Sequence, residues 1–315
     1  MLGRAANGVY WMSRYLERAE NTARLLDVGF RLALTRGSGR SQEEEWRSVL
    51  TTTGQSAAFA QRFDDFSGIQ VINFVLRDKD NPASVLRMIE NARTNARIVR
   101  TSITSEVWEA TNESWMTLRE AMARPVREST LGEVLGAVRR QATLVRGALE
   151  GSMLRNEVFN FSRIGTFIER ADNTARILDV KYYVLLPSVA WVGSTLDNVQ
   201  WETLLRSVAG DRAYRWLNKG TMDPRGIAKF LILDSQFPRS LVFCFDKIRS
   251  NMAGLALQYG HETRAHEMLR DAVTRLSQTS VEQIFDRGLH QFLVAFIGDA
   301  GRLGDAIAAD YRFID

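Results

Sequence analysis

The sequence predicts an all-α fold, and three observations support this prediction. Only five prolines occur among the 315 residues, and the glycines and prolines fall mostly where a helix would end. Signals that start a helix are frequent. No run of alternating apolar and polar residues is long enough to build a sheet. We therefore expect helices separated by short loops.

The first helix is predicted near residues 8–35, because its apolar residues recur with the period of a helix and fall on one narrow arc. These residues are Met12, Leu16, Ala19, Ala23, Leu26 and Phe30. They form the predicted core face. Further helices are expected near 42–60, 67–77, 82–109, 112–123 and 130–150, with a matching series from about 156 to the end.

Several helix starts are marked by capping signals. A hydroxyl residue followed three positions later by Glu or Gln forms a capping box, and this pattern begins at Ser41, Thr130 and Ser280. Asn81-Pro82 and Asp223-Pro224 place a capping residue before a proline at the first helical position.

The sequence contains an internal duplication. A shift of 152 residues superposes Glu17–Val28 on Glu169–Val180 with ten of twelve positions identical. Weaker matches continue at shifts of 155 and 156 residues, pairing Trp46, Leu50, Phe74, Asp78, Pro82 and Ser84 with Trp201, Leu205, Phe230, Asp234, Pro238 and Ser240. We predict two helical repeats, 1–150 and 151–315, packed about a pseudo-two-fold axis as one compact unit.

Composition excludes several classes of function. The net charge is +4, but acidic and basic residues alternate along the chain, so no nucleic-acid partner is expected. No apolar stretch is long enough to span a membrane. The single cysteine, Cys244, lies in an apolar run and excludes an intramolecular disulfide. We expect a protein of the cytoplasm with no membrane contact, in which Cys244 is a core residue.

Residues of the duplicated segment are the candidates for chemistry. Glu17, Asn21 and Arg24 share one polar stripe of the first helix, and Glu169, Asn173 and Arg176 repeat it. Surface residues under no functional or structural constraint would have diverged in sequence between the two copies. The matching polar stripe is therefore under some constraint.

Three explanations are open for this constraint. Ion pairs between the two copies would hold them together. Alternatively, a peptide or amino-acid ligand is bound, with its carboxylate or a phosphate on arginines and its amine on a glutamate. The residues of that ligand site are Arg14, Arg18, Asn21, Arg24, Arg163, Arg170, Asn173 and Arg176. In the third, Glu17 or Glu169 acts as a catalytic general acid or base.

Other chemistries are not expected. His261 and His266 are five residues apart, which places them on different sides of a helix, so we interpret them as surface histidines without zinc. No Glu-x-x-His pair, Gly-rich phosphate loop or dinucleotide motif occurs. The sequence predicts no metal and no cofactor. Trp46 and Trp201 are predicted core anchors.

Three segments of the chain resemble the signatures of the bacterial alpha-E family, namely Tyr10–Asp27, Ile168–Tyr183 and Phe230–Ser240. The resemblance implies helices with a characteristic glutamate, here Glu17 and Glu169. Family members are typically encoded beside, or fused to, a circularly permuted ATP-grasp protein, often with a transglutaminase-like protein nearby. This implies a substrate-binding or accessory component of an amide-forming system. A structural scaffold and a Glu-dependent enzyme remain the alternatives.

Overall fold

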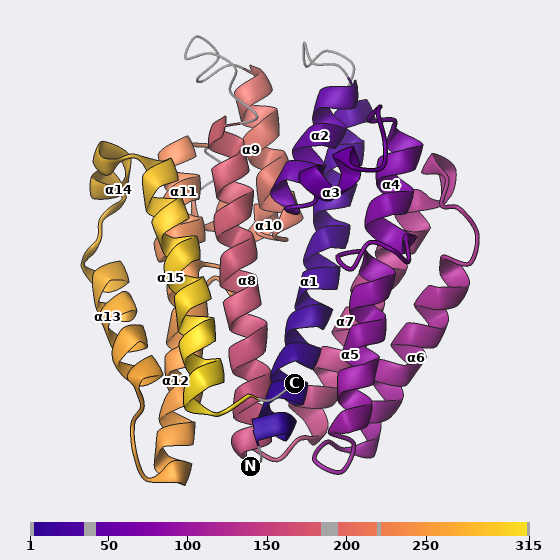
Figure 1. The fold of residues 1–315 in the computed structure, drawn as a ribbon. Coiled ribbons are helices and arrows are strands. Elements are labelled where there is room, and N and C mark those ends of the chain that lie inside the picture. Colours follow the sequence, from indigo (N-terminus) through magenta and orange to yellow (C-terminus); the bar gives the residue numbers. More distant parts are fainter. Residues whose placement is uncertain (1–2, 35–41, 184–194, 219–221, 314–315) are drawn as a thin grey trace. The chain divides into compact units, whose positions relative to one another are not determined.

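The computed structural model describes residues 3–34, 42–183, 195–218 and 222–313 of the chain (Figure 1). Within these ranges the regular structure is helical and no strand occurs, which confirms the predicted all-α class. The chain divides into two compact units, residues 1–162 and 163–315. None of the described helices is long and apolar enough to cross a membrane.

The first unit is built around one long helix, α1 (Gly3–Leu34). It packs most extensively against α5 (Val85–Ile98) and also against α7 (Glu128–Ser152) and α2 (Gln42–Thr52), as Figure 1 shows. The remaining helices are α3 (Ser56–Ala60), α4 (Gly68–Arg77) and α6 (Ser105–Ala121). The long helix therefore packs mainly against three others.

The second unit begins within α8 (Glu157–Tyr183), another long helix. It continues with α9 (Thr195–Ser207), α10 (Asp211–Leu217), α11 (Pro224–Leu233), α12 (Leu241–Tyr259), α13 (Arg264–Gln278), α14 (Val281–Arg287) and α15 (Leu289–Asp310). Helix α13 packs against both α12 and α15.

The predicted core positions are confirmed with one exception. Five of the six apolar residues on the core face of α1 are buried, and Phe30 is half-buried. Trp46, Trp201 and Cys244 are buried as well. The prediction for α1 was nevertheless too narrow, because polar residues next to the apolar arc, among them Glu17 and Asn21, are also buried.

Two helix boundaries differ from the prediction. The expected helix 42–60 breaks at Gly54, whose φ of +70° lies in the left-handed region and ends α2. The expected break near 110 lies instead at 99–104, where Thr104 caps α6 by accepting a hydrogen bond from the backbone N–H of Val107. The predicted helices 82–109 and 112–123 were therefore wrong at their junction.

The capping signals were partly right. Asp223 and Ser280 cap α11 and α14 as predicted. Thr130 lies inside α7, whose N-cap is Arg127, so the predicted start there was wrong. Asn81 starts no helix either, because Ser84 is the N-cap of α5. Ser41 lies outside the described residues.

A turn after α4 recurs after α11. The Ser84 hydroxyl donates to the carbonyl of Asp78 (2.7 Å), and the Ser240 hydroxyl donates to the carbonyl of Asp234. Each serine also caps the next helix, α5 or α12. The matched residues of the sequence repeat therefore make the same local contacts in each unit.

The end of α2 likewise resembles the end of α9. The backbone N–H of Gln55 donates to Leu50 at 2.8 Å, and that of Gly210 donates to Leu205 at 2.8 Å. The residue before each donor is left-handed, with φ +70° at Gly54 and +55° at Ala209. Each of these helix ends is followed by an edge-to-face aromatic pair, which is Phe59 with Phe74 in the first unit and Tyr214 with Phe230 in the second. The pseudo-two-fold packing of the repeats stays a prediction.

Candidate functional site

The candidate site of the first unit is a cluster of buried charges on α1. Glu17 and Glu20 lie one turn apart and are 2% and 0% exposed. The Nη1 atom of Arg146, on α7, lies 3.0 Å from Glu17 Oε2 and 2.7 Å from Glu20 Oε2. Buried carboxylates need such pairing, because desolvation of an unpaired charge is costly. One arginine therefore serves two carboxylates.

A second arginine completes this cluster from α1 itself. Arg24 donates to Glu20 Oε1 through both Nε (3.0 Å) and Nη2 (2.7 Å). Further along α1, Asp27 lies 3.1 Å from Arg139 of α7 and 3.1 Å from Arg31. Carboxylates of α1 are thus linked to α7 at two levels, by Arg146 and by Arg139.

The other candidates on α1 lie beside this cluster. Asn21 is buried, whereas Arg14 and Arg18 are half-buried. The Arg14 guanidinium lies 4.7 Å from the centroid of the Trp11 ring, a cation–π contact, and donates to the Tyr10 hydroxyl at 3.3 Å. Arg14 is therefore held by aromatic rings.

The candidates of the second unit lie on α8. Glu169 and Asn173 are buried. Arg176 is exposed and pairs with Asp172 one turn earlier, at 2.7 Å, which repeats the pairing of Arg24 with Glu20. Asp179 lies 2.5 Å from Nδ1 of His290, on α15.

The two remaining arginines contact Phe167. The guanidiniums of Arg163 and Arg170 lie 4.6 and 5.3 Å from the centroid of its ring. Arg170 is buried and also donates to the carbonyl of Pro238 at 3.3 Å. It therefore ties α8 to the turn that precedes α12.

Three site residues were missed by the sequence reasoning: Arg139, Arg146 and His290. The arginines are seven residues apart, which places both on one face of α7 beside the buried Val138 and Val145. That spacing was a usable signal. It does not reveal which helix the arginines contact, because Arg146 and Glu17 are 129 residues apart in the chain.

The histidine interpretation was wrong at one of its two positions. His261 is exposed, as expected. His266 is buried, and its Nε2 lies 2.9 Å from the carbonyl oxygen of Met252 while its Nδ1 accepts the backbone N–H of Thr263 at 3.0 Å. His266 therefore caps α13 and ties it to α12. Among the described residues no group of side chains is arranged to hold a metal ion.

Comparison with known proteins identifies one family. Residues 1–311 match Alpha-E, which is described as a predicted alpha-helical domain with a conserved ER motif. The dipeptide Glu-Arg occurs twice in this chain, at Glu17-Arg18 and Glu169-Arg170, the equivalent positions of the two repeats. The motif thus coincides with the two glutamates predicted from the duplication.

Relatives of the chain are found in mycobacteria. An uncharacterized protein of Mycobacterium bovis is 24% identical over 297 residues, and one of Mycobacterium tuberculosis is 23% identical over 297 residues. The alignments cover 89% of this chain and 33% of each relative. The chain therefore spans about a third of the length of the curated relatives it matches. No solved structure matches it.

Proposed function

This chain belongs to the Alpha-E family, and we propose that it is an accessory, substrate-holding component of an ATP-grasp-dependent system that forms amide or peptide bonds. Its partner is a circularly permuted ATP-grasp protein, and a transglutaminase-like protein acts in the same cytoplasmic system. The ligand is a peptide or an amino acid. The two repeats pack about a pseudo-two-fold axis.

The length of the relatives is the observation that carries this proposal. About two thirds of each mycobacterial chain lies outside the region shared with this protein. The helical region therefore occurs there in the same chain as a larger amount of other sequence. A region joined to others in one polypeptide usually works beside them, which supports an accessory role over an independent one.

The charge cluster of the first unit argues against catalysis by Glu17. A general base needs a free lone pair within reach of a substrate proton. Glu17 is nearly inaccessible to solvent, and Arg146 lies 3.0 Å from its Oε2. Arg24 and Arg146 also both contact Glu20. These contacts fix the carboxylates in place.

The proposal is tested by reconstitution with the circularly permuted ATP-grasp protein of the same organism. ADP release and amide formation are measured with glutamate and short peptides as acceptors, with and without this chain. We expect amide formation to need both proteins, and we expect calorimetry of the isolated chain with Mg-ATP to give no binding heat. Equal product without the chain, or tight specific ATP binding by the chain alone, would overturn the proposal.

A purely structural scaffold is the second candidate, and the contacts of Arg146 favour it. Two variants separate the candidates: Glu17→Gln and Glu169→Gln, with the exposed Glu133→Gln as control. A scaffold loses stability in both variants while the reconstituted reaction stays at the wild-type rate per folded molecule. A substrate-holding site keeps or gains stability and loses the reaction, because functional sites are often not optimised for stability.

A further inference from the structure

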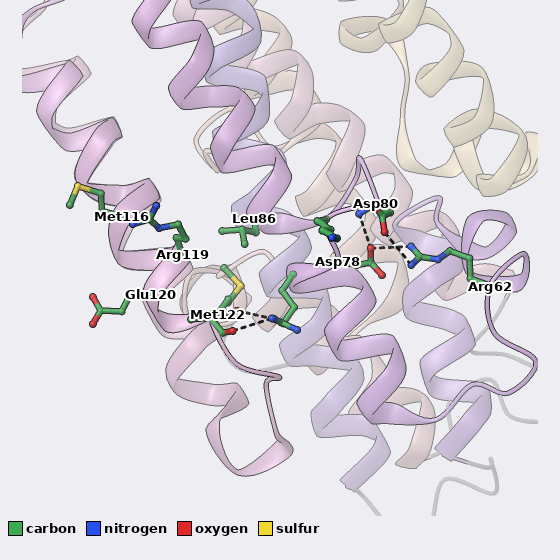
Figure 2. Close-up of a pocket in the computed structure, with 11 residues that line it drawn as sticks. Arg62, Asp78, Asp80, Leu86, Met116, Arg119, Glu120 and Met122 are labelled. Atoms are coloured by element: carbon green, nitrogen blue, oxygen red, sulfur yellow. Dashed lines mark hydrogen bonds and ion pairs between the residues drawn. The ribbon is translucent and has the colours of Figure 1, made fainter.

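A groove of about 860 Å³ lies in the first unit, and no residue of α1 lines it (Figure 2). It is formed by the turn between α4 and α5, by the first turn of α5 and by the C-terminal end of α6. Sites for small ligands commonly have volumes of about 300–1,000 Å³. The groove is therefore large enough for a short peptide.

One side of the groove is apolar. Leu86, Met116 and Met122 line it, and Met116 is 51% exposed although it is a large hydrophobic residue. Methionine has three rotatable bonds and a polarisable sulfur, so it adapts to ligands of different shape. This wall suits an aliphatic side chain.

The charged residues of the groove differ in their partners. Arg62 is 3.0 Å from Asp78 and 3.8 Å from Asp80. Arg77 donates to the carbonyls of Met122 (2.8 Å) and Ala123 (3.2 Å) and so caps the C-terminal end of α6. The guanidinium groups of Arg62 and Arg77 therefore already bind carboxylates or carbonyls of the protein itself.

Lys79 and Arg119 are the cations left for a ligand. Both are exposed, and neither forms an ion pair within the described part of the chain. The Arg119 guanidinium lies 4.3 Å from the centroid of the Trp115 ring, which orients it but leaves its N–H groups available. The one remaining acid, Glu120, points away from Leu86 in Figure 2.

The turn that carries Lys79 is held rigidly. Asp78 Oδ1 accepts the backbone N–H of Asp80 at 2.8 Å, and the Asp78 carbonyl accepts the Ser84 hydroxyl. Asn81 Nδ2 donates to Phe74 O at 2.9 Å. Lys79 therefore extends from a fixed backbone, which lowers the entropy lost when a ligand binds.

The second unit indicates that the fold does not need these charges. Its equivalent turn keeps Asp78 as Asp234, but Lys79 and Asp80 become Ser235 and Gln236 at the shift of 156 residues. The turn nevertheless makes the same serine-to-carbonyl contact. At shifts of 155 and 156 residues, Arg62 and Arg77 correspond to Leu217 and Leu233.

The same holds for α6. Its buried positions Val107, Thr111, Ser114 and Leu118 align with Ala265, Leu269, Ala272 and Leu276 of α13 at a shift of 158 residues. At this shift Arg119 and Glu120 correspond to Ser277 and Gln278. Six of the seven charged residues lining the groove thus have uncharged counterparts, Asp78 being the exception. The architecture that the two units share therefore does not require these charges.

We propose that this groove binds a short acidic peptide. A carboxylate of the peptide contacts Lys79 and Arg119, and a neighbouring aliphatic side chain packs on Leu86 and Met116, next to the buried Met122. Arginine suits a carboxylate because its N–H groups match the two oxygens. The residues that line this groove do not include Glu17 or Glu169. The test uses the isolated chain, so its result does not depend on the proposed ATP-grasp partner.

The test uses the N-acetylated and C-amidated peptide Leu-Glu-Leu-Glu as probe, with Leu-Gln-Leu-Gln as its uncharged counterpart. Binding is measured by calorimetry and by NMR of protein labelled with ¹³C at the methionine methyl groups. The signals of Met116 and Met122 are assigned from Met116→Leu and Met122→Leu. We expect both signals to shift with the acidic peptide, and we expect the glutamine peptide to bind at least about tenfold more weakly.

A double variant locates the charge requirement. Lys79→Gln with Arg119→Gln should weaken binding at least about tenfold. Arg97→Gln with Arg140→Gln removes the same charge from exposed positions outside the groove and should change binding less than about twofold. Circular dichroism checks that both variants are folded. Unmoved Met116 and Met122 signals, equal binding of both peptides, or equal loss in both double variants would overturn the proposal.

Discussion

The Nη1 atom of Arg146 lies 2.7 Å from the Oε2 atom of Glu20, whose side chain is completely buried. The same nitrogen lies 3.0 Å from Glu17 Oε2. A guanidinium on α7 therefore bridges two carboxylates on α1, and the packing of these helices depends on charge as well as on apolar contact.

Replacing Arg146 by methionine should destabilise the protein strongly. The change keeps most of the apolar side chain but leaves two buried carboxylates without their shared partner, and loss of one member of a buried pair costs about 3–5 kcal/mol. We expect about 3 kcal/mol, because the Arg146 side chain is 27% exposed. Urea denaturation gives the free energy of unfolding.

The matched control for this prediction is Arg140→Met on the same helix. Arg140 is exposed, so its loss should change stability by less than about 0.5 kcal/mol. Adding Glu20→Gln to Arg146→Met should recover part of the lost stability, because it removes one of the two buried negative charges that Arg146 contacts in the wild type. Equal stability of the two arginine variants would show that the ion pairs contribute nothing.

Local signals explain how much of the fold could be predicted. The apolar period of α1 and the caps at Asp223 and Ser280 depend on neighbouring residues, and all three were predicted correctly. The expected start at Asn81 was wrong because its side chain donates to Gln55, 26 residues earlier, at 2.7 Å. Sequence spacing gives no sign of such a contact.

The candidate site shows the same limit. The duplication identified Glu17 and Glu169 as constrained, and both are buried. It did not identify Arg146, because the pairing of α1 with α7 is a tertiary contact. It also did not predict that Asp27 pairs with an arginine while its counterpart Asp179 pairs with His290.

The capping serines of the repeated turn should contribute similarly in the two units. Ser84→Ala and Ser240→Ala each remove a hydroxyl that donates to a carbonyl and caps a helix. We expect each to cost about 1–2 kcal/mol. Thermal unfolding measures the loss, and the exposed Ser129→Ala serves as control. A loss in only one of the two variants would contradict the energetic equivalence of the turns.

Tyr311 should make stability depend on alkaline pH. Burial raises the pKa of its hydroxyl to about 12, and the charge of Asp310 adds to this effect. The pKa of Tyr311 in the folded protein exceeds the unfolded value of about 10. Its contribution to the free energy of unfolding is therefore complete below about pH 10 and is lost as the pH rises towards about 12. Urea denaturation at roughly pH 9 and roughly pH 11 measures this loss. Tyr311→Phe should lose less stability between them, and an unchanged loss would contradict the assignment.

Gly54 and Ala209 should respond to substitution with opposite signs. Both follow a helix in the left-handed conformation, with φ +70° and +55°. An added Cβ at Gly54 would meet no atom within 4 Å, so Gly54→Ala tests the backbone conformation without a steric clash. A left-handed alanine costs about 1–2 kcal/mol, partly offset by the greater freedom of glycine when unfolded. We therefore expect Gly54→Ala to destabilise by about 1 kcal/mol and Ala209→Gly to stabilise by up to about 1 kcal/mol in urea denaturation.

Exposed Gly151→Ala, within the last turn of α7, is the control for a glycine in helical backbone and should stabilise slightly. If Ala209→Gly destabilised the protein, the left-handed backbone at this position would not be the strained feature that its φ indicates.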